Sequence, residues 1–387
     1  MKLPIDLKAV IEAATDIESA RSTPVSVSVL IDDSAPGDVA AHVRSAFVGA
    51  GAHARVTVGY FAGPAFSPYE GDDMAVIVAG FSEEVGRRAA EIRAAGVPVM
   101  VVTSMPSLVA DMASAYGNPI PEGDLVAPEG VEGCEADGDA ACASGEVAGA
   151  HVSVFAGIRA AKSAGAGAAA GFAGAAASSP DVLDAPIPID DAAAAALDRR
   201  MGEWVVAACR EKRLALALSF PFVRKPLSLE AVSATSLQNA GIGLVLFIPG
   251  ADMPLMTLNQ AKMLLQIAAA YGEPMSAARV KELAAIVAGG FACRSVARQV
   301  AGAVPGIGWA VKAGVGYAGT KAMGLAAIEY FERGGNIAGL AGVVSSATAK
   351  ATQIAGDVAA TPAGARVLST VKTAVRQGAA SVLKKTE

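Results

Sequence analysis

The sequence predicts an α/β plus all-α protein, in which a small doubly wound sheet domain precedes a glycine-rich helical domain. Within the first 120 residues, short apolar runs such as Met74–Ala79 and Val97–Val102 alternate with segments of helical periodicity. That alternation is typical of a mainly parallel sheet with helices on both faces. A stretch of low complexity rich in Ala and Gly follows, and we expect it to be a disordered linker.

The elements of the first domain follow from apolar spacing and from the turn residues between them. In chain order they are a helix at Asp6–Arg21, a strand at Val25–Asp32, a helix at Ala40–Val48, strands at Ala54–Phe61 and Met74–Ala79, a helix at Glu83–Ala95 and a strand at Pro98–Thr103. Only a Gly- and Pro-containing loop, Ala62–Asp72, separates the second and third strands, so these two strands are expected to be antiparallel. The order resembles the first half of a small GTPase.

The segment after the first strand differs from a phosphate-binding loop. A Walker A loop has the pattern GxxxxGK[ST], in which backbone amides and a lysine bind phosphate. Here the segment contains Asp32, Asp33 and Asp38, which would repel a nucleotide. The guanine-reading Asn-Lys-x-Asp motif is replaced by Thr103-Ser104-Met105-Pro106. We therefore predict a degenerate GTPase-like scaffold at residues 1–120, with no cofactor.

Aspartates at strand ends allow a second interpretation, a divalent-cation site. Its ligands would be Asp32, Asp33, Asp72 and Asp73. Adjacent aspartates more often cap turns, and we favour that interpretation and predict no metal.

Composition narrows the function classes. With 31 basic and 37 acidic residues the chain has a net charge of −6, which argues against a nucleic-acid partner. The segment Met1–Asp6 lacks the features of a signal peptide, so a cytoplasmic location is expected. The 4 cysteines and 3 histidines lack the spacing of a zinc site or of a catalytic Cys-His or Ser-His pair. No catalytic residue is predicted.

Charge and complexity also set the expected domain boundaries. Residues 121–189 are acidic at first and then rich in Ala and Gly, which predicts the linker. Residues 190–335 form the predicted helical domain, and Asp190 and Asp191 are expected to cap a helix that runs through Cys209. Within it, Trp204 is either a core residue or a membrane-interface anchor. Residues 336–387 form a basic amphipathic tail that either packs on the bundle or binds an anionic membrane surface.

Amide and charged side chains interrupt the apolar segments of the helical domain. A buried polar group without a partner costs about 1 to 3 kcal/mol, so these side chains need partners. The candidate structural or interaction residues are Gln238, Asn239, Asp252, Asn259, Gln260, Gln266, Arg294, Arg298, Lys312 and Lys321. Thr257 and Gln260 match a capping box, which predicts a helix start at this point.

Two interpretations of these polar residues stay open. Asn259, Lys262 and Gln266 form one stripe on a helix, which either hydrogen-bonds across a helical core, the interpretation we favour, or lines a path for a ligand or an ion. Arg294 and Arg298 lie one turn apart and bind either an internal carboxylate such as Asp252, or an external anion. Recurrent glycines indicate close helix approach, while the charges argue against a spanning helix.

The helical region resembles a known bacterial domain of unknown function. The resemblance rests on Gln238–Pro254, Thr257–Gln260, Gln266–Gly272, Arg294, Arg298, Pro305, Gly308, Trp309 and Gly319–Gly324, and it covers about Arg213 to Gly335. That domain is found at the C-terminus of YcjF-like inner-membrane proteins and of some Era-like GTPases. The resemblance implies association with the inner membrane and names no reaction.

Taken together, these features predict a non-enzymatic scaffold or adaptor. It would associate with the inner face of the membrane or with a protein partner through its helical domain, and self-association is a further possibility. The alternatives are a nucleotide-dependent switch with a non-standard site, and a membrane-embedded transport or pore component.

Overall fold

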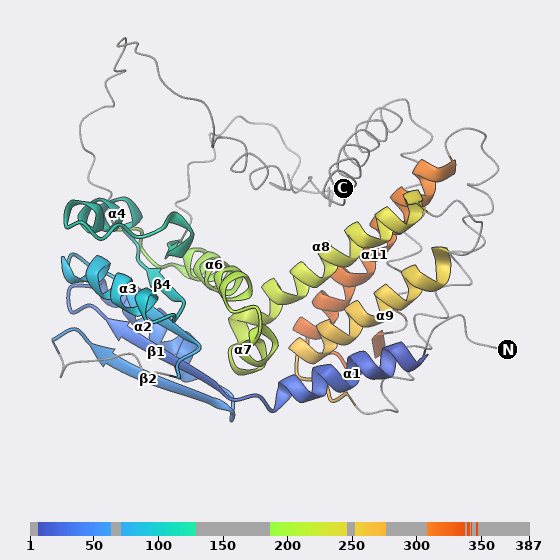
Figure 1. Cartoon of the computed structure of the whole chain (residues 1–387), viewed down its shortest axis with the longest axis horizontal. Helices are drawn as coiled ribbons and strands as arrows, with labels where there is room; N and C mark the ends of the chain where they lie inside the picture. Colours follow the sequence, from blue (N-terminus) through green and yellow to red (C-terminus); the bar gives the residue numbers. More distant parts are fainter. Residues whose placement is uncertain are drawn as a thin grey trace, which may run out of the picture. The chain divides into compact units, whose positions relative to one another are not determined.

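The computed structural model describes residues 7–62, 71–128, 186–245, 252–275 and 308–336, with a few single positions beyond them. Mixed α/β architecture with helical parts is confirmed (Figure 1). The elements are α1 (Leu7–Arg21), β1 (Val25–Ile31), α2 (Gly37–Val48), β2 (Ala54–Tyr60), β3 (Met74–Val78), α3 (Glu84–Ala94), β4 (Val99–Val102), α4 (Pro106–Ala115), the 3-10 turn η1 (Glu122–Asp124), β5 (Leu125–Val126), α6 (Asp191–Ala208), α7 (Arg213–Ser219), α8 (Pro221–Val245), α9 (Asp252–Ala270) and α11 (Gly308–Glu332).

The sheet is parallel throughout its described strands, in the order β2-β1-β3-β4-β5. The expected antiparallel pairing of the second and third strands is therefore wrong. β1 lies between β2 and β3, so the chain must cross β1 between these two strands. Residues 61–73 exceed the dozen residues that such a parallel crossover needs. The GTPase-like order was inferred partly from that pairing, whereas this strand order is that of flavodoxin-like doubly wound sheets.

Alternate residues of β1 face two different cores. Val25, Val27 and Val29 belong to a cluster with residues of α2, α6, α7 and α8, whereas Leu30 belongs to a cluster with residues of α3 and α4. Trp204 of α6 is only 7% exposed, and its indole Nε1 donates a hydrogen bond to Asp124 at 3.3 Å. Of the two interpretations of this tryptophan, the structure supports the core residue.

The first residues of the predicted linker belong to the sheet part. Leu125 and Val126 form β5, which pairs with Val101 and Val102 of β4, and Asp124 forms an ion pair with Arg93 at 2.9 Å. Two apolar residues in an acidic stretch are too short a pattern to predict a strand. They are enough to pair with the edge of β4. The remainder of the predicted linker, residues 129–185, lies outside the described residues. The expected helix cap is confirmed, since Asp190 Oδ1 accepts a hydrogen bond from Ala193 N at 2.7 Å.

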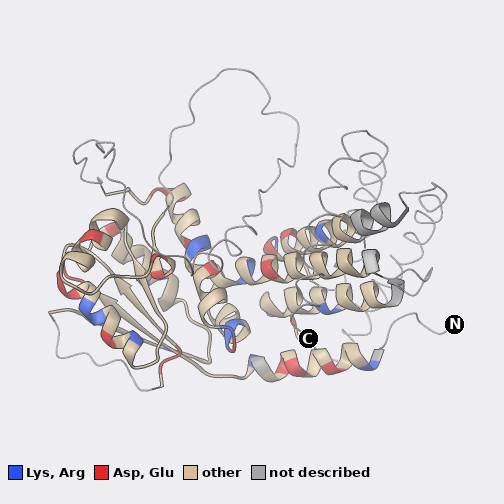
Figure 2. Ribbon diagram, turned by 45° about the horizontal axis from the view of Figure 1, so that its top comes forward, with Lys and Arg blue, Asp and Glu red and all other residues tan. Residues whose placement is uncertain are grey.

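Three long helices, α8, α9 and α11, pack side by side, and α1 packs against α9 (Figure 1). Their shared core includes Val10, Ala14, Val232, Met263 and Ile328. These helices are mostly tan, and so uncharged, in Figure 2. The helix predicted to start at Thr257 begins at Asp252 instead, and Thr257 is buried inside it.

The two parts of the described fold exchange their terminal helices. The sequence assigns α1 to the sheet domain, but its apolar residues lie in the core of the long helices. It also assigns α6 to the helical domain, but Leu197, Met201 and Val205 pack in a core with the sheet. The helix that precedes the sheet, α1, therefore packs on the long helices, and the helix that precedes the long helices, α6, packs on the sheet.

Close helix approach, inferred from the recurrent glycines, is present at Gly324. A Cβ at this position of α11 would lie 2.3 Å from Val232 Cγ2 of α8. We expect Gly324→Ala to lower the free energy of unfolding by about 1 to 2 kcal/mol in urea denaturation, because overpacking costs about 1 to 3 kcal/mol and better helix propensity returns up to about 1. Adding Val232→Ala should remove much of the overpacking, so the loss in the double variant should fall below the sum of the single losses. Strict additivity would contradict this contact.

A histidine joins α2 to α6. His42 Nε2 lies 2.8 Å from Asp198 Oδ1, and this hydrogen bond raises the pKa of His42, while burial partly opposes the rise. A folded-state pKa above the reference value of 6.5 gives stabilisation that is complete below that pH and is lost as the pH rises through the folded-state pKa.

We expect Asp198→Asn to destabilise the protein more near pH 6 than near pH 8.5, by less than about 1 kcal/mol, as for partly exposed pairs. Asp191→Asn, on the same helix, is the matched control. A loss independent of pH in Asp198→Asn would refute the pairing.

Candidate functional site

The carboxyl edge of the sheet is the first place to look for a ligand site. In doubly wound sheets of this order, ligands bind outside the carboxyl ends of the strands at the switch point between β1 and β3, where the strand order reverses. Asp32 follows β1 at this position, and only 3% of it is exposed.

Asp32 bonds to the backbone amides of both strand ends. Its Oδ1 accepts a hydrogen bond from Ser34 N at 3.1 Å. Its Oδ2 accepts bonds from Ser34 Oγ at 2.9 Å, from Gly80 N at 2.9 Å and from Ser82 N at 3.2 Å. Backbone amides at this edge are the groups that would bind an anionic ligand. Here a carboxylate of the chain itself already binds them.

The loops that follow β1 and β3 are also in direct contact. A Cβ on Gly80 would lie 2.3 Å from the carbonyl carbon and oxygen of Ser34 and 2.4 Å from Ala35 N. Only glycine permits this backbone approach. At the switch point the two loops are therefore in contact, and the backbone amides that could bind a ligand already donate to Asp32.

The four aspartates of the possible cation site lie at opposite ends of the strands. Asp33, beside Asp32 at the carboxyl edge, accepts a hydrogen bond from Ala62 N at 2.7 Å. Asp72, at the amino edge, accepts hydrogen bonds from the hydroxyls of Ser26 and Ser28. Within the described residues, no group of three or more potential metal-binding side chains occurs. These aspartates bind hydroxyls and amides of the chain itself.

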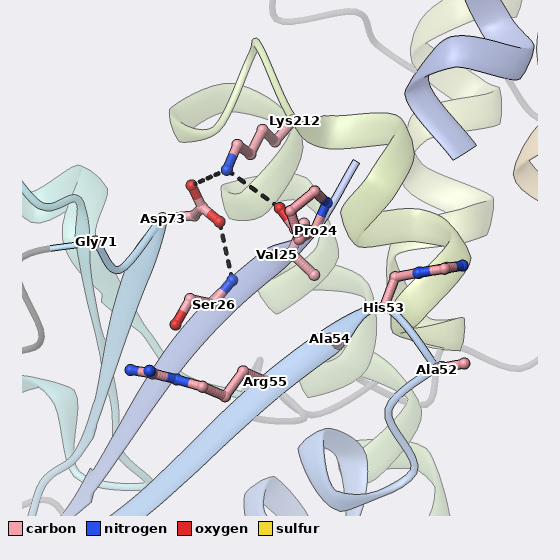
Figure 3. Close-up of a pocket in the computed structure, with 10 residues that line it drawn as sticks. All are labelled: Pro24, Val25, Ser26, Ala52, His53, Ala54, Arg55, Gly71, Asp73 and Lys212. Atoms are coloured by element: carbon pink, nitrogen blue, oxygen red, sulfur yellow. Dashed lines mark hydrogen bonds and ion pairs between the residues drawn. The ribbon is translucent and has the colours of Figure 1, made fainter. Parts of the chain in front are cut away.

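A cavity of about 510 Å³ opens at the amino edge of the sheet, where Arg55 and His53 contribute to its lining (Figure 3). Its lysine, Lys212, forms an ion pair with Asp73 at 2.6 Å and donates to Pro24 O at 3.2 Å. Asp73 also accepts a hydrogen bond from Ser26 N at 2.9 Å. These groups bind one another, so they attach the start of α7 to the sheet.

One thiol lies close to this edge. Cys209 is 8% exposed, and its burial, together with the negative charge of Asp73, raises its pKa to about 12. A thiol with that pKa is protonated at neutral pH and is a poor nucleophile.

A second cleft, of about 320 Å³, lies among the helices and contains part of the predicted polar stripe. Apolar residues from α1, α7, α8 and α9 contribute to its wall, and polar residues of α8 and α9 complete it. The lining consists of Ile17, Arg213, Leu214, Leu227, Glu230, Ala231, Ala234, Thr235, Gln238, Asn259, Lys262, Met263 and Gln266.

A buried polar network lies next to this cleft. Asn239 of α8 has no exposed surface, and its Nδ2 donates to Thr320 Oγ1 of α11 at 2.9 Å and to Met256 O of α9 at 3.4 Å. Its Oδ1 accepts a hydrogen bond from Asn259 Nδ2 at 3.1 Å. Gln260 Nε2 also donates to Thr320 Oγ1, at 2.8 Å. The network connects three helices and fixes one amide hydrogen of Asn259, a cleft residue.

The structure brings together only some of the predicted site residues. Asn239, Asn259 and Gln260 share the network, and Gln238, Asn259 and Gln266 line the cleft. Gln266 is exposed, so the expected bond across the core holds for Asn259 and not for Gln266. Lys321 lies 5.8 Å from the ring centre of Tyr317, away from the cleft.

Four of the predicted residues cannot be placed by side chain. Asp252 begins α9 and Lys312 lies in α11, but their side chains are outside the described set, as are Arg294 and Arg298 entirely. The proposed pairing of Asp252 with the arginines therefore stays a prediction. The basic tail after residue 346 also lies outside the described residues.

Thr320 is the member of the buried polar network that the candidate residues from the sequence did not include. It accepts hydrogen bonds from both Asn239 and Gln260. The sequence does indicate this position, because Thr320 is a hydroxyl residue in an apolar helix, one turn before the close-packed Gly324.

Comparison with known proteins adds no relative. No family model, curated protein or solved structure matches this chain. None of the helices in the described residues combines the length and apolar character needed to cross a membrane.

Proposed function

We propose that this chain is a non-enzymatic scaffold or adaptor, in which the α/β part is structural and the helical part associates with a membrane surface or a protein partner. The resemblance of about Arg213 to Gly335 to the YcjF-like domain supports an association with the inner membrane.

The observation that carries the proposal is the carboxylate of Asp32 at the switch point. It accepts hydrogen bonds from the amides of Ser34, Gly80 and Ser82, where a phosphate group would otherwise bind. A nucleotide would have to displace this side chain and separate the loops packed at Gly80. We therefore infer that the α/β part is a rigid support and does not bind a nucleotide at this edge.

Exposed leucines on the long helices support the second half of the proposal. Leu237 of α8, Leu255 of α9 and Leu325 of α11 are 65%, 47% and 40% exposed. Single exposed leucines are common on protein surfaces. Three exposed leucines on neighbouring helices that carry few charges are consistent with a surface that contacts a partner. Leu237 is the most exposed of the three, so it is the best position for a probe.

The test is photocrosslinking in intact cells. We would place a benzophenone amino acid at Leu237, and in a matched control at Tyr116 of the α/β part, which is 55% exposed. The proposal predicts an adduct at Leu237 and none at Tyr116, and mass spectrometry of the adduct would distinguish a lipid from a protein. Absence of adducts at Leu237, Leu255 and Leu325, or equal labelling at Tyr116, would refute contact through the helices.

A further inference from the structure

The cleft between α8 and α9 has an unbalanced positive charge. Its charged residues are Arg213, Glu230 and Lys262. Arg213 Nη1 donates to Glu230 Oε2 at 2.6 Å, so these two charges cancel. In the described part of the chain, Lys262 forms no ion pair, and it is partly buried at the cleft wall. Among the described residues, one ammonium group therefore lines this cleft without a paired carboxylate, in a protein with a net charge of −6.

Uncharged hydrogen-bonding groups accompany this lysine. Gln238, Gln266 and Asn259 supply amides, and Asn259 is held by its bond to the buried Asn239. Leu214, Leu227 and Met263 supply apolar surface in the same cleft. A pocket with an apolar wall and a few oriented polar groups is the usual form of a small-molecule site.

We propose that this cleft binds a monoanionic carboxylate that carries a short apolar group. The carboxylate would accept hydrogen bonds from the Lys262 ammonium and the neighbouring amides, and the apolar group would lie against Leu214, Leu227 and Met263. The volume of about 320 Å³ is near the lower end of known ligand pockets, so the bound group is small. A phosphate dianion fits less well, because the ammonium of Lys262 balances only one of its two negative charges.

Two sources present this chemistry, a free carboxylic acid and the C-terminal residue of a peptide. The site goes beyond the adaptor proposal, because a small acid would bind whether or not the long helices contact a partner. Failure of either proposal leaves the other standing.

Calorimetric titration of the full chain tests the site. The ligands are hexanoate, its uncharged analogue hexanamide, and a tripeptide that ends in leucine, with a free or an amidated C-terminus. We expect saturable binding of hexanoate or of the free-acid peptide, and whichever binds identifies the source. Neither amide should bind with comparable affinity. No binding of either acid, or equal binding of the corresponding amide, would overturn the proposal.

A pair of matched variants assigns the charge. Lys262→Met keeps an unbranched side chain, most of its length and its helix propensity. We expect it to weaken binding about tenfold or more, as for the loss of one charged hydrogen bond. Lys321→Met makes the same change on α11 outside the cleft and should leave binding unchanged. Circular dichroism would verify that both variants fold. If Lys262→Met unfolds the chain, Gln266→Ala, at an exposed position, should still weaken binding. Equal affinities for wild type and Lys262→Met, or for wild type and Gln266→Ala in that case, would overturn the assignment.

Discussion

Replacing Asp32 with alanine should lower the free energy of unfolding by about 3 to 5 kcal/mol, one of the two largest losses that we expect from a single substitution. The substitution removes the acceptor for the amides of Ser34, Gly80 and Ser82 and for the Ser34 hydroxyl. The bond from Gly80 N is buried, and a buried donor left without a partner costs about 1 to 3 kcal/mol, whereas the partly buried donors of Ser34 and Ser82 each cost less. Urea denaturation followed by circular dichroism would measure the loss.

The neighbouring aspartate provides the control for this substitution. Asp33 accepts one hydrogen bond, from the Ala62 amide, at an exposed position. Asp33→Ala should therefore cost less than about 1 kcal/mol. Asp32→Asn keeps one acceptor oxygen and should lie between the two alanine variants. Similar losses for Asp32→Ala and Asp33→Ala would show that the Asp32 bonds do not organise the switch point.

The second large effect is expected at Asn239. Asn239→Ala should lower the free energy of unfolding by about 2 to 4 kcal/mol, because it removes the central member of a buried network. The bonds lost are those to Thr320, Met256 and Asn259, and a cavity forms where the amide was. Urea denaturation would again give the free energy.

A double-mutant cycle separates the network from simple loss of volume. Asn239→Leu leaves the Thr320 hydroxyl without one of its amide partners, and Thr320→Val alone removes an acceptor from Asn239. Both changes together remove the donor and the acceptor, so the combined loss should be smaller than the sum of the single losses. Gln238→Ala, at the adjacent exposed position, should change stability by less than about 0.5 kcal/mol. Additive losses would mean that Asn239 and Thr320 contribute independently.

The sheet could be predicted from local patterns, but its topology could not. Apolar runs such as Met74–Ala79 place β1 to β4 within a residue or two of their observed positions. The direction of β2 relative to β3 depends on which strand lies between them, and this is a tertiary property. The sequence shows no helical pattern between β2 and β3, which indicated a hairpin, yet a connection of that length is long enough to cross β1.

The exchange of α1 and α6 shows the same limit at the level of domains. Apolar residues at helical spacing predict both helices, but the spacing does not say which core receives them. Val10 and Ala14 of α1 pack with the long helices, and Leu197 and Met201 of α6 pack with the sheet.

The polar residues of the helical part were predictable as a group that needs partners. Asn239, Asn259 and Gln260 have those partners, and Thr320 completes the set. The capping-box prediction failed because α9 begins at Asp252, so Thr257 and Gln260 lie inside the helix, where both side chains are buried. The same residue types satisfy a helix end or a helix interface, and sequence spacing alone does not separate the two.

Amide NMR would show directly whether the chain itself occupies the switch point of the sheet. The resonances of Ser34, Gly80 and Ser82 would be followed while GDP, ATP or inorganic phosphate is added to the full chain. We expect no saturable change in these three resonances at millimolar ligand. Saturable shifts centred on them would show that a nucleotide or phosphate displaces Asp32, and would contradict the scaffold proposal.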